Sequence, residues 1–230
     1  NFIYKNSLKL IKKINKSKIS YKIIFINDAS SDNTLKELKR VKSKFKNISI
    51  ISYKKNLGKS AALLVGLKRC KNNIVVFYDC DLPYFTYLPK VIKLLKRGKE
   101  FVTIDRRALK SKINRSKFNF YQISRFTIST IVNYIIAVTL IKNFKGDTQS
   151  GLKGFYLNEK FKKQNFISKK FFLDAEIIAF FSKENIKITS IPIKYEISEQ
   201  SSIKIFDLSN FIYIYELLKI ILLRKLIKFW

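Results

Sequence analysis

Residues 74–81 read I-V-V-F-Y-D-C-D, a short and continuously apolar run that leads into two acidic residues on alternate positions. Five apolar residues bounded by polar ones are typical of a buried strand. Asp79 and Asp81 then lie at the mouth of the strand, where two carboxylates can share one hard divalent cation, Mg²⁺ or Mn²⁺, that keeps open positions for phosphate oxygens. The stretch predicts a strand ending at a metal and phosphate site; an acidic triplet in a solvated loop is the alternative interpretation.

Strands and helices alternate on both sides of this stretch. We expect strands at 21–26, 48–52, 74–78, 101–104, 151–157 and 186–193, and helices near 4–14, from 34, at 58–70, 87–96, 126–141 and 171–183, and from about 208. Such alternation predicts an α/β fold with a largely parallel, doubly wound sheet, in which ligands gather at the carboxyl ends of the strands.

Two segments in the C-terminal half of the chain could contact a membrane. Residues 126–141 carry no charge, but sixteen positions fall short of the roughly 20 needed to span a bilayer, so we expect a buried or interfacial helix. The last helix mixes apolar residues with Lys219, Arg224, Lys225 and Lys228, which suits a membrane surface, an ordinary amphipathic core helix being the alternative. We expect one domain over 1–207 and an amphipathic, membrane-associated helix over 208–230.

Composition narrows the chemistry. With 230 residues, 47% of them hydrophobic, the chain can bury one large core. Its 47 Lys and Arg against 16 Asp and Glu give a net charge of +31, which indicates an anionic partner or, alternatively, the codon bias of an AT-rich genome. There is no histidine, so histidine bases and histidine-bound metals are excluded. Cys70 and Cys80 have no metal-binding spacing and fit a reducing compartment.

Three further blocks accompany the acidic one. Residues 24–34 read I-F-I-N-D-A-S-S-D-N-T, residues 56–67 read N-L-G-K-S-A-A-L-L-V-G-L, and residues 147–155 read D-T-Q-S-G-L-K-G-F. With D-C-D-L between the second and third, the order and spacing resemble the family-two inverting glycosyltransferases of the GT-A fold, especially the polyprenyl-phosphate (dolichyl-phosphate) mannosyl- and glucosyltransferases. The resemblance covers nearly the whole chain.

On the donor side, the resemblance implies a UDP- or GDP-hexose as the nucleotide sugar. Asp28 corresponds to a family carboxylate that contacts uracil or ribose, although an Asx-type loop residue is the alternative. Gly58 and Lys59 correspond to a helix start near the nucleotide, which also suits anions, unless the glycine only permits the helix entry. Asp79 and Asp81 correspond to the motif for the metal and the diphosphate.

Pro83 departs from that motif, because lipid-phosphate mannosyltransferases often have at this position a glutamine that joins the metal shell. The resemblance therefore extends the metal site no further than the two aspartates.

On the acceptor side, Asp147, Gln149, Gly151 and Lys153 match a D-T-Q-x-G-[FL]-K block in the acceptor half of the site. Residues 173–176 resemble an F-D-x-E block that contains Asp174 and Glu176, although this pair could equally stabilise a helix start. Basic residues expected to contact an acceptor phosphate are Arg106, Arg107, Lys153 and Lys204.

The acceptor decides the mechanism. A lipid phosphate is already an anionic nucleophile at pH 7 and needs cations to hold it in line with the sugar, with Arg106 first among them. A sugar hydroxyl would need a carboxylate base, Asp147 first and then Asp174.

We therefore expect a metal-dependent hexosyltransferase that acts on polyprenyl phosphate at the cytoplasmic face of a membrane, with no nucleic-acid partner. The alternatives are a transferase that extends a cell-surface polysaccharide or glycolipid, and a non-catalytic basic module that binds a membrane surface or nucleic acid.

One expected element is missing from this sequence. Members of the family begin with a strand and a P-x-Y-N-E-type loop, whereas here the first helix follows Asn1 at once. We expect an N-terminally truncated catalytic domain with an open or rearranged sheet centre, poorly stable and weakly active on its own.

Overall fold

The computed structural model describes residues 2–71, 73–80, 84–114, 119–141, 144, 146–196 and 210–226. Asp81, Pro83 and Lys204 lie outside the described residues. The helices are α1 (Phe2–Asn15), α2 (Thr34–Lys42), α3 (Lys59–Arg69), α4 (Leu88–Lys96), α5 (Phe120–Leu140), α6 (Glu159–Lys163), α7 (Leu173–Lys183) and α8 (Asn210–Leu226), with a 3₁₀ turn at Phe85–Tyr87. The strands are β1 (Ile23–Asp28), β2 (Ile48–Tyr53), β3 (Ile74–Tyr78), β4 (Phe101–Asp105), β5 (Lys112–Asn114), β6 (Leu152–Tyr156), β7 (Ile188–Pro192) and β8 (Lys194–Glu196).

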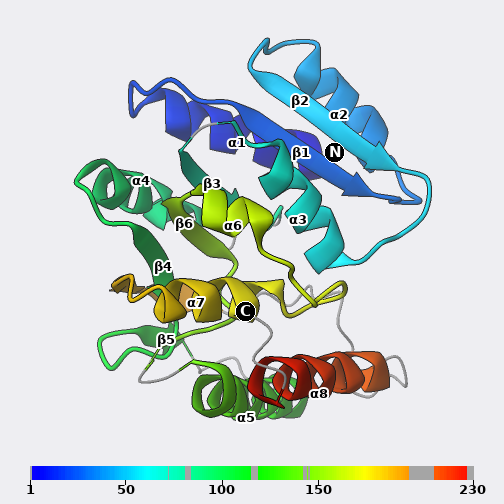
Figure 1. The fold of residues 1–230 in the computed structure, drawn as a ribbon. Coiled ribbons are helices and arrows are strands. Elements are labelled where there is room, and N and C mark those ends of the chain that lie inside the picture. The colour runs from blue at the N-terminus through cyan, green and yellow to red at the C-terminus, as the bar shows by residue number, and fades with distance from the viewer. Residues whose placement is uncertain are drawn as a thin grey trace.

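The strands form three hydrogen-bonded groups, flanked by helices (Figure 1). β1 pairs with β2, and β5 pairs with β8, both in parallel. The four-stranded sheet has the order β3-β6-β4-β7, with β4 and β7 parallel and β6 antiparallel to both of its neighbours. The α/β class and the largely parallel pairing are confirmed, and β6 alone accounts for the antiparallel pairs of the described residues.

The sheet is divided between β1 and β3. Among the described strands, none pairs with the second edge of β1 or of β3. Both strands instead line one cavity of about 2250 Å³, and α1 and α3 contribute to its wall. The sequence led us to expect an open or rearranged sheet centre. In the described strands, the sheet is interrupted between β1 and β3.

The α5 helix corrects the expectation for residues 126–141. It has 21 residues, because it continues through Arg125 back to Asn119, whose side chain accepts a hydrogen bond from the backbone N–H of Gln122 in a capping box. Among the described residues it is the helix long and apolar enough to cross a membrane by length and composition, and only 11% of its most apolar window is buried. Its length was therefore underestimated, and the alternative of a buried helix is wrong.

An aromatic cluster forms the centre of the core between the four-stranded sheet and α7. Phe155, in the middle of β6, lies 5.7 Å from Phe101, 5.1 Å from Phe161 and 5.0 Å from Phe181, measured between ring centroids. Its side chain has no exposed surface. Helix α7 is apolar on almost every side because the sheet, α5 and α3 surround it.

Replacing Phe155 with alanine tests this core. We expect Phe155→Ala to lower the free energy of unfolding by about 3 to 5 kcal/mol, because it removes a fully buried ring and leaves a cavity. Urea denaturation followed by circular dichroism measures the change. The matched control is Phe120→Ala, whose ring is 79% exposed on α5 and whose loss should change stability by less than about 0.5 kcal/mol. Equal effects of the two substitutions would contradict this description of the core.

Candidate active site

Asp28 holds the loop that leads into α3. It ends β1, and its two carboxylate oxygens accept hydrogen bonds from the backbone N–H groups of Leu57 and Gly58, each at 2.8 Å. This geometry is the loop role considered as the alternative for Asp28. The residue also lines the large cavity, so the loop role and a contact with a nucleoside are compatible.

The first turn of α3 is closed against another loop of the protein. Gly58 has a φ of +100°, and a Cβ at this position would lie 2.7 Å from the carbonyl oxygen of Lys169, so glycine is required here. The N–H groups of Ser60 and Ala61 donate to the carbonyls of Lys170 and Lys169, at 3.1 and 2.9 Å. Anion binding by these two amides, expected from the helix start, is therefore not available in this structure, and Lys59 offers its side chain instead.

Four charged side chains form a network beside that turn. The Lys59 ammonium lies 2.9 Å from Oδ1 of Asp79 and 3.9 Å from Oδ2 of Asp174. Lys153 donates to Oδ1 of Asp174 at 2.8 Å. Lys59 and Asp79 are partly exposed and line the cavity, whereas Lys153 and Asp174 are buried beneath them. The structure thus brings together two predicted donor-side residues and two predicted acceptor-side residues.

Asp79 provides a carboxylate that suits a divalent cation. Its backbone N–H donates to the carbonyl of Gly151 at 3.1 Å, and a Cβ on Gly151 would come within 2.0 Å of Asp79 Oδ2. Glycine at 151 therefore leaves room for this carboxylate. Within the part of the chain that is described, no cluster of three His, Cys, Asp or Glu residues is present, and Asp81, the expected second ligand, lies outside it.

Lys153 does not reach the cavity. Its side chain has no exposed surface, and its ammonium donates to the Ser150 carbonyl and to Asp174. Burial lowers the pKa of Lys153, and the neighbouring carboxylate of Asp174 opposes that effect. The expected direct contact between Lys153 and an acceptor phosphate does not fit this geometry, because the ammonium is enclosed by protein. Lys153 instead joins β6 to α7 under the site.

A second cluster lies after β4. Arg106 donates to both carboxylate oxygens of Asp147, with Nη2 2.9 Å from Oδ1, and Nη1 of Arg107 lies 3.4 Å from Oδ1. The backbone N–H of Gln149 donates to Oδ1 as well, at 3.0 Å. Burial alone would raise the pKa of Asp147, but Arg106, then Arg107 and Lys153, lower it far below its usual range. A carboxylate held this firmly in the ionised form is a weak base, so the role of general base does not fit Asp147.

Helix α5 supports this second cluster through residues that sequence reasoning missed. Asn133 is buried, accepts hydrogen bonds from the N–H and hydroxyl of Thr148, each at 2.8 Å, and donates to the Gly146 carbonyl at 3.1 Å. Nη2 of Arg107 donates to the hydroxyl of Ser129 at 2.5 Å. Arg125 lines the same cavity as Arg106 and Arg107. The sequence signals for these contacts were the polar Ser129 and Asn133 within the uncharged residues 126–141, and Arg125 just before them.

Comparison with known proteins agrees with this architecture. The family model "Glycosyl transferase family 2" matches residues 4–165. A dolichyl-phosphate beta-glucosyltransferase of Trichomonas vaginalis is 26% identical over 195 residues, covering 81% of this chain and 58% of the relative. A dolichol-phosphate mannosyltransferase of Pyrococcus furiosus is 27% identical over 111 residues, covering 48% of this chain and 31% of the relative. The chain thus spans 58% and 31% of the length of these two curated relatives.

Solved structures show the fold. Glucosyl-3-phosphoglycerate synthase from Mycobacterium tuberculosis, in complex with uridine diphosphate, superposes with a TM-score of 0.57 at 16% identity, over 85% of this chain and 67% of that one. The same synthase in complex with Mn²⁺, UDP-glucose and phosphoglyceric acid gives a TM-score of 0.56 at 15% identity, over 85% of this chain and 67% of that one. The expected GT-A architecture is confirmed, and at this identity the likeness concerns the fold alone.

The ion pair between Asp147 and Arg106 predicts how the stability of the protein depends on pH. We expect Asp147→Asn to lower the free energy of unfolding at pH 7 by about 3 to 5 kcal/mol, because it leaves Arg106 beside a neutral group. The folded-state pKa of Asp147 is depressed, so its contribution is present above the unfolded pKa of about 4 and is lost as the pH falls below that value. The stability difference between the parent and the variant should therefore shrink between pH 5 and about pH 3.

Urea denaturation at several pH values measures this difference. Glu100→Gln, at an exposed position, is the control and should change stability by less than about 0.5 kcal/mol at each pH. A difference for Asp147→Asn that stays constant down to pH 3 would show that ionisation of Asp147 adds nothing.

Proposed function

The chain belongs to glycosyl transferase family 2, and from that membership we propose that it transfers a hexose from a UDP- or GDP-sugar to a polyprenyl phosphate at a membrane surface. The observation that carries the proposal is the pair Arg106 and Arg107 on the cavity wall, held in place by the buried carboxylate of Asp147. A fixed pair of guanidinium groups suits a phosphate acceptor. The curated relatives whose names include dolichyl-phosphate or dolichol-phosphate support the same substrate class.

On the donor side, we assign metal binding to Asp79 and Asp81. Asp79 presents a hard oxygen ligand at the cavity wall, and a bound Mg²⁺ or Mn²⁺ would neutralise the charge that develops on the nucleotide diphosphate as it leaves. Lys59, 2.9 Å from Asp79, supplies a further positive charge to the same leaving group. Asp28 and Gly58 keep the loop before Lys59 in place.

On the acceptor side, an oxygen of the lipid phosphate attacks C1 of the sugar, and the bond between C1 and the diphosphate oxygen breaks with its electron pair on the diphosphate. No proton has to be removed from the acceptor, since the phosphate is anionic at pH 7. Arg106 and Arg107 orient it, and Arg125 on the same wall and Lys204 are assigned to the same task.

The alternatives fit the structure less well. Transfer to a sugar hydroxyl would need a carboxylate base, but Asp147 is bound by Arg106 and Asp174 by Lys153. A non-catalytic basic module would need neither a metal nor a nucleotide sugar. Its residues would also have no reason to match a transferase family. Salt and metal dependence separate these classes, because a simple electrostatic binder weakens steeply with salt and is indifferent to Mn²⁺.

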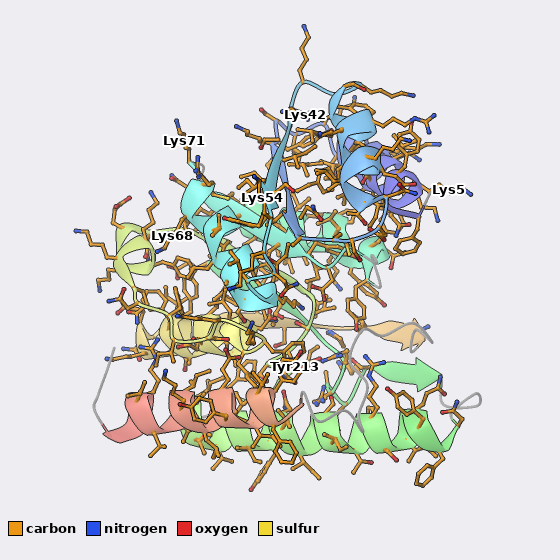
Figure 2. All side chains as sticks on the ribbon, turned by 90° about the vertical axis from the view of Figure 1, so that its right-hand side faces the viewer. Lys5, Lys42, Lys54, Lys68, Lys71 and Tyr213 are labelled. Atoms are coloured by element: carbon orange, nitrogen blue, oxygen red, sulfur yellow. The ribbon has the colours of Figure 1, made fainter. Side chains whose placement is uncertain are left out.

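A membrane surface is the partner that fits the outer faces of α5 and α8. The two helices pack against each other at one end of the molecule, and side chains project from their far sides, away from the sheets (Figures 1 and 2). Large apolar side chains are exposed on both helices, and they include Ile131, Tyr134 and Val138 on α5 and Phe211, Tyr215 and Leu218 on α8. We call this surface the α5–α8 floor. An apolar surface of this extent on a basic protein is typical of binding in the plane of an anionic membrane, and we assign it to the cytoplasmic face.

Catalysis is tested by incubating the protein with polyprenyl phosphate and a panel of UDP- and GDP-hexoses, with Mn²⁺ or with chelator. We expect transfer from one donor of the panel, dependent on the metal, and a fall in kcat of at least about 100-fold for Asp79→Asn. Asp32→Asn, at an exposed position outside the cavity, is the matched control and should retain activity. Full turnover in chelator would contradict the metal assignment, and transfer to a sugar hydroxyl alone would contradict the acceptor assignment.

Membrane binding is tested on the α5–α8 floor. We expect the combined variant Tyr134→Ser, Val138→Ser, Tyr215→Ser and Leu218→Ser to bind phosphatidylglycerol-containing vesicles at least tenfold more weakly, because each large apolar side chain gains about 1.5 to 3 kcal/mol on full burial. Co-sedimentation with vesicles measures the change. Phe2→Ser, an exposed apolar position on α1, is the control. Undiminished vesicle binding by the combined variant would contradict the assignment of the α5–α8 floor as the membrane-binding surface.

A further inference from the structure

Helix α8 buries two of its charged residues, Glu216 and Arg224, while Lys219 on the same helix is exposed. Glu216 and Arg224 are 7% and 4% exposed, whereas Phe211, Tyr215 and Leu218 are each more than half exposed. An amphipathic helix on a water-soluble surface has the opposite arrangement. Buried charges are costly unless they are paired, so the inner face of α8 must make specific contacts.

Glu216 is the centre around which the loop of residues 168–171 is folded. Its carboxylate accepts hydrogen bonds from the backbone N–H groups of Lys169, Lys170 and Phe171, at 2.7, 2.7 and 2.9 Å, and from the hydroxyl of Ser168 at 3.2 Å. Three successive backbone amides directed at one carboxylate form an anion-binding nest that the protein fills with its own side chain. A carboxamide in place of this carboxylate would keep only one acceptor oxygen and would place an NH₂ donor against these partly buried amides.

The same loop closes the first turn of α3. The carbonyls of Lys169 and Lys170 accept the N–H groups of Ala61 and Ser60, and the hydroxyl of Ser60 bonds to the hydroxyl of Ser168 at 2.9 Å and to the N–H of Leu173 at 3.1 Å. The carbonyl of Lys169 also lies where a side chain at Gly58 would be. The position of this turn, and of Lys59 within it, therefore depends on the loop.

A second buried contact fixes α8 to the beginning of the loop. Arg224 forms an ion pair with Glu176 at 2.6 Å and donates to the carbonyl of Asn165 at 2.8 Å. Glu176 in turn accepts the N–H groups of Ile167 and Ser168. Glu176 is therefore a buried partner of α8, and it also lies in the first turn of α7, the helix start considered for it from the sequence.

An aromatic contact completes the connection. Tyr213 points from α8 toward the body of the protein (Figure 2), and its ring lies 5.6 Å from that of Phe171. The Lys59 ammonium lies 5.6 Å from the centre of the same Phe171 ring. A path of direct contacts thus runs from α8 through the loop to Lys59.

We propose that Glu216 is a positioning residue through which the seating of α8 on a lipid surface sets the first turn of α3 and, with it, the affinity for the nucleotide-sugar donor. The inference rests on the proposed function for what this turn binds and for the lipid at the outer face of α8. The contacts that transmit the effect are independent of both. Loss of the Glu216 charge should free the loop, and the α3 turn should then lose the two carbonyls that hold it.

The test compares Glu216→Gln, which keeps the size of the side chain, with Lys219→Gln, an exposed position on the same helix. We expect hydrogen exchange at the amides of Ser60 and Ala61 to become at least tenfold faster in Glu216→Gln and to stay at the parent rate in Lys219→Gln. With UDP-glucose or GDP-mannose as donor, the donor KM should rise about tenfold in Glu216→Gln while the acceptor KM stays constant. Glu216→Asp, which keeps the charge, should fall between the parent and Glu216→Gln.

Vesicles containing phosphatidylglycerol provide the lipid measurement. They should slow exchange at Ser60 and Ala61 in the parent and have no such effect in Glu216→Gln. Parent-like exchange and donor KM in Glu216→Gln would overturn the proposal, as would a loss of stability with equal changes in both KM values. If Glu216→Gln does not fold, Ser60→Ala tests the same path from its other end and should raise the donor KM in the same direction.

The exchange measurement needs no substrate, so the two proposals can fail separately. Absence of sugar transfer with faster exchange in Glu216→Gln contradicts the proposed function and supports the coupling. Normal transfer with unchanged exchange contradicts the coupling alone.

Discussion

A charge buried in the protein interior has to be paired, and the structure depends on how this chain meets that requirement. The ammonium of Lys153 has no exposed surface and is paired with Asp174, which joins β6 to α7. Asp147 is equally buried and binds Arg106. Removing either partner would leave its counterpart uncompensated, so each pair is needed to hold its two structural elements together.

The sequence predicts best where local physics decides. Residues 74–78 were expected as a strand, and β3 has these bounds, because an apolar run bounded by polar residues leaves little choice. The length of α5 was missed because the helix begins at its N-cap, Asn119, and a charged residue within it, Arg125, does not interrupt it. Residue type was also informative at the site: Asp28, Lys59, Asp79, Arg106 and Arg107 all line one cavity.

Roles that depend on distant partners could not be read in this way. Lys153 was expected at the acceptor, but its strand is the second of four and pairs with Phe77 on one side and Thr103 on the other, so its side chain is enclosed. Nothing within a few residues of Lys153 reports this enclosure. The excess of lysine is similarly uninformative about position, because Lys42, Lys54, Lys68 and Lys71 extend into solvent at the end of the molecule away from α5 and α8 (Figure 2). The apolar side chains of the α5–α8 floor, and not the net charge, indicate where a membrane would bind.

The two helices of that floor divide the site between them. Through Ser129 and Asn133, α5 contacts Arg107 and the loop that contains Asp147, which we assign to the acceptor side. Through Glu216 and Arg224, α8 contacts the loop that closes the first turn of α3, which we assign to the donor side. Since α5 and α8 pack against each other, one surface contact with a membrane would act on both halves of the site at once. A reaction whose acceptor stays in the membrane and whose donor comes from water needs such an arrangement, because both substrates must be held in line at the same C1 atom.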